Sequence, residues 1–81
     1  MDELEKSDLI LRELYNCRTD GKYHSISAIC QALNIPLDSL LEMRDIVSNL
    51  KEDRFISAYF TMNDYSAVLT SDGIEYFEGN F

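Results

Sequence analysis

Residues 37–62 read LDSLLEMRDIVSNLKEDRFISAYFTM, and the spacing of their hydrophobic side chains changes halfway along. From Leu37 to about Asp53 the apolar residues recur every three or four positions, which is typical of an amphipathic helix. From Phe55 to Met62 apolar and polar residues alternate, which is typical of a half-buried strand. This stretch therefore predicts a helix followed directly by a strand.

A hairpin and a last short helix are expected downstream. Residues 63–66, Asn-Asp-Tyr-Ser, carry turn-forming side chains, and residues 67–70 can pair back on the first strand. One of residues 70–72 can cap a new helix by accepting a backbone N–H, and the Gly-Asn pair at 79–80 is expected to stop it. The second half of the chain thus predicts strand, turn, strand and helix.

Two more helices are expected in the first half of the chain. Residues 2–17 place leucine and isoleucine at helical spacing with charged residues opposite, and an Asp-Gly pair supplies a turn shortly after them. Residues 23–26 alternate for long enough to form a very short strand. A serine at 25 or 27 can cap the second helix, which residues 34–36, Asn-Ile-Pro, are expected to end.

One hydrophobic core is expected to join the helices to the hairpin. Apolar side chains from every helix and both long strands supply it. The residues assigned to this core are Ile10, Leu11, Leu14, Ile29, Leu33, Val47, Leu50, Phe60, Leu69 and Phe77. Cys17 and Cys30 lie on helical segments and are expected to be unbridged thiols.

Two motifs carry a resemblance to a known family. Residues 27–35, SAICQALNI, lead through a turn into the longer helix, which ends in NLKEDRFI at residues 49–56. Residues 69–77, LTSDGIEYF, contain a Leu-Thr-x-x-Gly segment. Together with the order of elements, these motifs make the chain resemble the winged helix-turn-helix superfamily, in particular small bacterial or phage-type domains.

The resemblance implies a fold and a role. The implied fold is α+β and forms a single domain over residues 1–81: a three-helix bundle with a β-hairpin wing and a short C-terminal helix. The implied role is that of a DNA-binding transcriptional regulator whose helix-turn-helix spans residues 26–53, with the third helix in the major groove.

Charge argues against DNA binding by this third helix. The chain has 15 acidic and 7 basic residues, and its formal net charge of −8 repels phosphate backbones. On a helix turning about 100° per residue, the side of residues 37–53 opposite the apolar arc holds carboxylates and no cation. Residues 55–81 contain no Lys or Arg. We therefore expect a regulatory module that acts through protein contacts, with another protein or with a second copy.

Candidate contact residues follow from both interpretations. For protein contacts they are Asp38, Glu42, Asp45, Asn49, Glu52, Tyr59 and Tyr65. For DNA contacts, the alternative, they are Arg18, Lys22 and His24 around the first loop. Each group of residues also has a structural explanation without a partner. The acidic residues can form a solvated helix face, and the tyrosines can pack in the core or across the hairpin. The cations of the first loop can compensate the charge at a helix end.

No pattern in the chain predicts catalysis. It contains no Gly-rich nucleotide loop, no metal-ligand spacing, and no nucleophile and base grouped around its one histidine. We therefore expect no catalytic residue, metal, cofactor or small-molecule substrate, and no enzymatic activity. The acidic start and the absence of a long apolar run argue against a signal peptide or a membrane span, so we expect a soluble cytoplasmic protein.

Overall fold

Four α-helices and a three-stranded antiparallel sheet build the part of the chain that the computed structural model describes, residues 2–80. The α+β class expected from the sequence is confirmed. The helices are α1 (Glu3–Asn16), α2 (Ile26–Ala32), α3 (Leu40–Glu52) and α4 (Ser71–Asn80), with a 3₁₀ turn at Arg18–Asp20. The strands are β1 (His24–Ser25), β2 (Ile56–Thr61) and β3 (Asp64–Leu69). No helix within residues 2–80 is long and apolar enough to cross a membrane.

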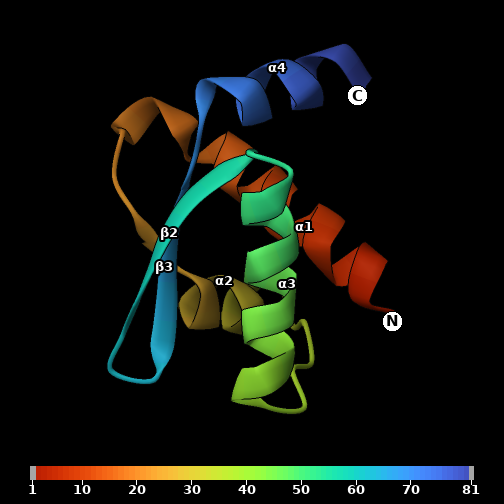
Figure 1. Ribbon diagram of the computed structural model, residues 1–81, viewed down its shortest axis with the longest axis vertical. Helices are drawn as coiled ribbons and strands as arrows, with labels where there is room; N and C mark the ends of the chain where they lie inside the picture. The colour runs from red at the N-terminus through yellow and green to blue at the C-terminus, as the bar shows by residue number, and fades with distance from the viewer. Residues whose placement is uncertain (1, 81) are drawn as a thin grey trace.

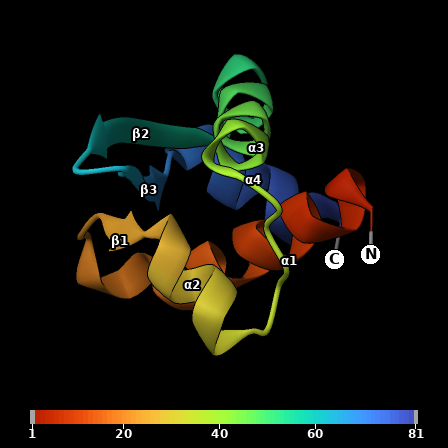
Figure 2. The ribbon, with the colours of Figure 1, turned by 90° about the horizontal axis from the view of Figure 1, so that it is seen from below.

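The sheet has the order β1-β3-β2, with β3 in the centre. The β2–β3 hairpin runs beside α3, and its tip lies at the same end of the molecule as the beginning of α3 (Figure 1). Helix α4 lies at the opposite end (Figure 1). Figure 2 looks onto the end with the hairpin tip and shows α2 and α1 across the molecule from α3.

Each α-helix begins behind a side chain that accepts one of its free backbone N–H groups. The acceptors are Asp2 for α1, Ser25 for α2, Ser39 for α3 and Thr70 for α4. Because Ser39 is the cap, α3 begins at Leu40, and the predicted start at Leu37 is wrong. Within the described residues α4 ends at Asn80, in the Gly-Asn pair expected to stop it, although Gly79 does not take the left-handed backbone.

Helices α2 and α3 end in the same way. The residues after their caps, Asn34 and Arg54, have left-handed backbone with φ of 56° and 65°. The next N–H then bonds back into the helix, as Ile35 does to the Cys30 carbonyl at 2.8 Å. This turn brings Ile35 into the core. Leu33, which was assigned to the core, is instead 37% exposed because it sits at the end of α2 before the turn.

The hairpin turn is tighter than predicted. Met62 and Asn63, with φ of 49° and 63°, form a two-residue turn of the kind whose twist matches the flanking strands. Strand β3 therefore begins at Asp64, and the four-residue turn expected at 63–66 is wrong. The two strands pair without interruption from Ile56 opposite Leu69 to the turn, which carries the hairpin tip past the core.

The core is one cluster of buried side chains from α1, α2, α3 and the sheet. Of the residues assigned to it, those confirmed are Ile10, Leu11, Leu14, Ile29, Val47, Leu50 and Leu69. Phe60 is 51% exposed, because it lies on the part of the hairpin that extends past the core. Phe77 is half-buried and stacks on the Tyr15 ring, with centroids 4.3 Å apart, outside the central cluster.

The Leu-Thr-x-x-Gly segment holds α4 against the end of α3. Thr70 caps α4 and donates its hydroxyl to the Arg54 carbonyl at 2.6 Å, while its N–H donates to the Phe55 carbonyl at 3.0 Å. A Cβ on Gly73 would lie 2.1 Å from the same Phe55 oxygen. Glycine is therefore required here by close backbone approach.

Candidate functional site

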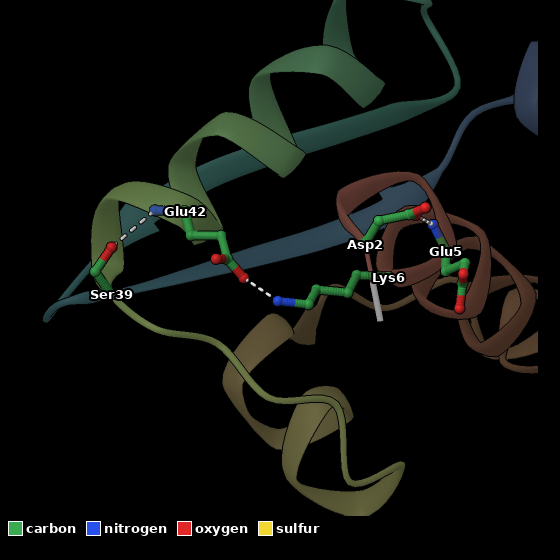
Figure 3. Close-up of polar contacts among 5 residues, drawn as sticks. All are labelled: Asp2, Glu5, Lys6, Ser39 and Glu42. Carbon is green, nitrogen blue, oxygen red and sulfur yellow. Dashed lines mark hydrogen bonds and ion pairs between the residues drawn. The ribbon is translucent and has the colours of Figure 1, made fainter.

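The beginning of α3 is tied to α1 by an ion pair. Lys6, only 5% exposed, donates from Nζ to Glu42 Oε1 at 2.5 Å (Figure 3). This hydrogen bond is the main cause that raises the pKa of Lys6 above its ordinary value, although burial opposes the shift. The Glu42 carboxylate is therefore already bound by a cation of the same chain. The expectation that it belongs to an acidic face without cations is wrong.

Of the other acidic-face candidates, Asp45, Asn49 and Glu52 are exposed and lie three or four positions apart along α3. Asp38 lies in the loop before α3 rather than on the helix. Asn49 donates to Glu3 Oε1 of α1 at 3.2 Å. Asp45 contacts the neighbouring Arg44 at 3.4 Å, and both side chains are exposed. Glu52, at the far end of α3, is also exposed. The row of polar side chains along α3 thus lies partly against α1 and partly in solvent.

Exposed hydrophobic side chains gather instead where α3 begins and the hairpin turns. Leu40 is 40% exposed, Leu41 57%, Phe60 51% and Met62 93%. We call these four residues the apolar end. Leu40, Leu41 and Phe60 line one hollow, and adjoining exposed apolar side chains of this kind mark a site of interaction more often than scattered ones do.

Two hollows lie side by side at the apolar end, because Leu40 lines both. The smaller, of about 270 Å³, lies between α3 and the hairpin. The larger, of about 520 Å³, lies between α2, the loop after it and the hairpin tip. The smaller is lined by Leu40, Leu41, Arg44, Phe60 and Tyr65. The larger is open to solvent and includes the edge of the buried Cys30.

The two tyrosines predicted to share a contact patch lie on opposite faces of the hairpin. Tyr65 is paired across the strands with Phe60, and their rings are 4.9 Å apart on the face toward α3. Tyr59 is the next residue along β2, so it points to the other face, where its ring lies 5.0 Å from Tyr23. The predicted contact patch that would include both Tyr59 and Tyr65 is therefore wrong. Phe60, which the sequence placed in the core, takes the place of Tyr59 beside Tyr65.

Asp64 fixes the distal hairpin to the start of α2. Its carboxylate accepts from the Ser25 hydroxyl, from the Ser27 N–H at 3.1 Å and from the Ser27 hydroxyl at 2.8 Å. Burial opposes its ionisation, but these hydrogen bonds outweigh burial and hold the pKa of Asp64 below its ordinary value. The sequence had placed Asp64 in a turn and gave no sign of this contact.

Of the three residues named for DNA contact, Arg18 and His24 have side chains with local contacts, whereas the side chain of Lys22 is exposed. Arg18 donates to the Tyr15 carbonyl at 2.9 Å and lies 3.8 Å from the centre of the Tyr15 ring. His24 contacts Asp20 at 3.0 Å. The Lys22 backbone N–H also donates to Asp20, and this bond is the main cause that lowers the pKa of that carboxyl. These contacts hold the first loop together and engage the side chains of Arg18 and His24 within it.

Comparisons of the chain with protein-family models, with curated proteins and with solved structures find no match. Function is therefore inferred from the geometry of the apolar end and its surroundings. Within residues 2–80, no three His, Cys, Asp or Glu side chains gather in a way that could hold a metal ion.

Proposed function

We propose that the chain is a non-enzymatic regulatory module with the winged-helix layout, acting in the cytoplasm through contacts with another protein at the apolar end. The layout is supported by the order of the three helices before the hairpin and by the way Thr70 and Gly73 lead into α4. The single observation that carries the functional part is the exposure of Leu40, Leu41 and Phe60 around one hollow.

The same surface is ill suited to duplex DNA. In a winged-helix protein the third helix and the hairpin are the parts that approach DNA. Here the first turns of α3 and the hairpin present hydrophobic side chains, and Arg44 is the one cation lining the two hollows. Since phosphate neutralisation by Lys and Arg supplies most non-specific affinity for DNA, this surface favours a protein partner.

A direct test is a titration of the purified protein with mixed-sequence duplex DNA at low salt, where phosphate contacts are strongest. We expect no detectable binding. Binding at micromolar or better affinity at physiological salt, abolished by Arg18→Ala with Lys22→Ala, would instead support the DNA-binding alternative.

Protein contact is tested by photocrosslinking in the cells that make the chain. A photoreactive amino acid in place of Leu41 should give a discrete crosslink to a protein, and the crosslink should disappear when Phe60→Ser is added. The matched control is the same photoreactive residue in place of Glu75, which is exposed on α4 at the other end of the molecule. Equal crosslinking from both positions would contradict the proposal.

A further inference from the structure

We infer that the apolar end takes an amphipathic helix of a partner protein, with apolar side chains seated in the two hollows beside Leu40 and with Lys or Arg residues flanking them. This inference rests on the proposed function and specifies the chemistry of the partner. It follows from three properties of the surface: its shape, its charge and the rigidity of its backbone.

The shape suits apolar side chains that project from one face of a helix, although the lining of the larger hollow is mixed. Its apolar side chains are Cys30, Ile35, Leu37, Leu40 and Met43, and its polar ones are Ser27, Gln31, Ser39 and Asn63. Leu40 separates two adjoining hollows, one against the hairpin and one against α2 and its following loop. Residues three or four positions apart on a helix have Cβ atoms about 5–6 Å apart and point the same way. Two such side chains can therefore straddle Leu40, the arrangement found when an amphipathic helix lies in a hydrophobic groove.

The charge calls for cations on the partner. Asp38 is exposed between Leu37 and Ser39, which line the larger hollow, and Asp45 is exposed beside Arg44, which lines the smaller one. The Arg44–Asp45 contact at 3.4 Å is between exposed side chains, and such pairs contribute little. A basic partner would be attracted by the net charge of −8, which repels a second copy of the chain.

The backbone around the hollows is fixed before any partner arrives. At the start of α3, Ser39 accepts from the Glu42 N–H at 3.2 Å, while the Glu42 side chain is held by Lys6 (Figure 3). On the other side, Asp64 is held by the serines that precede and begin α2. A surface already ordered loses little conformational entropy on binding.

The test uses three synthetic peptides of about 18 residues, long enough to form a helix. The first has Leu on one helical face and Lys on the other, the second has Glu in place of Lys, and the third has the composition of the first in scrambled order. We expect the full chain to bind the first peptide at least about tenfold more tightly than either of the others. Equal binding of the first and scrambled peptides would reduce the interaction to bulk charge and overturn the inference.

Matched variants locate the binding. Leu41→Gln should weaken binding of the Lys peptide at least about tenfold, whereas Leu4→Gln, at a leucine 74% exposed on α1, should change it by less than about twofold. Asp38→Asn with Asp45→Asn should weaken it more than Glu52→Gln with Asp53→Asn. If the paired variants have equal effects, the site is not the apolar end.

The outcomes separate this inference from the proposed function. A specific crosslink at position 41 combined with no binding of the Lys peptide would leave the protein-contact function standing and refute the basic helix. Mass that rises with concentration in sedimentation, and falls with Leu41→Gln, would assign the apolar end to a second copy instead. Binding to DNA without a crosslink would refute both proposals.

Discussion

The hydrophobic side chains at the two ends of α3 differ in how far they are buried. At the C-terminal end Leu50 is buried, and the ring of Phe55 stacks on Tyr76 of α4 with centroids 4.2 Å apart. At the N-terminal end Leu40 is 40% exposed and Leu41 57% exposed. Both ends have a backbone fixed by hydrogen bonds. The N-terminal end therefore has exposed apolar side chains on a backbone that is held by hydrogen bonds. These side chains remain accessible to a partner.

The largest expected effect comes from truncating the same side chain at the two ends of α3. Leu50→Ala should lower the free energy of unfolding by about 2–5 kcal/mol, because the cavity it leaves is in the core. Leu40→Ala should lower it by less than about 1 kcal/mol, since that side chain already contacts water. Chemical denaturation measures both values. Equal losses would mean that the two ends are packed alike.

The packing of α4 on the C-terminal end of α3 should also be disturbed by adding a single methyl group. Gly73→Ala should lower the free energy of unfolding by about 1–3 kcal/mol, because the new Cβ would meet the Phe55 carbonyl oxygen and α4 must move. Gly79→Ala is the matched control in the same helix, where a Cβ meets nothing within 4 Å. It should be neutral or slightly stabilising, since Ala favours helix over Gly. Thermal unfolding of both variants tests the difference, and equal loss from both would contradict the assigned contact.

The sequence predicted those parts of the fold that depend on local pattern. The change of hydrophobic period after Asp53 located the end of α3 and the start of β2. The caps of α2 and α4, Ser25 and Thr70, were each among the two or three capping candidates that the sequence offered, because a side-chain oxygen at a helix start has a fixed role. The Leu-Thr-x-x-Gly segment was recognised by resemblance, and its physical reason, close approach to the Phe55 carbonyl, required the structure.

The candidate site was predicted less well, because it depends on contacts between distant segments. Nothing local indicates that Lys6 reaches Glu42, which removed one of the acidic candidates. The hairpin was expected to turn at residues 63–66 because of the turn-forming side chains there. The structure turns earlier, with Met62 in the left-handed backbone that is unusual outside Gly and Asn. That earlier turn decides where Phe60 lies. The alternation of apolar and polar residues around Phe60 correctly predicted a strand, but this pattern could not show that the strand extends past the core.

Acid should loosen the anchor of the hairpin. The pKa of Asp64 is lower in the folded state than in the unfolded chain. The ionised carboxylate therefore stabilises the fold fully above the ordinary carboxyl pKa, and this stabilisation is lost as pH falls through the lowered value. Asp64→Ala should cost about 1–2 kcal/mol at neutral pH through lost hydrogen bonds to Ser25 and Ser27. The variant should also show a weaker acid dependence of stability than the wild type. Parallel acid dependence in the two proteins would contradict this role.

The smallest expected effects on stability lie at the apolar end itself, and they sharpen the comparison most. Leu41→Gln should change the free energy of unfolding by less than about 0.5 kcal/mol, because the side chain is mostly in solvent and Gln forms helix well. Met62→Asn should be neutral or slightly stabilising, since Asn tolerates the left-handed backbone of this turn better than Met. A fold selected for stability alone would not need Met at this position. A loss above about 1 kcal/mol in either variant would mean that these side chains support the fold, and the apolar end would no longer be explained by binding.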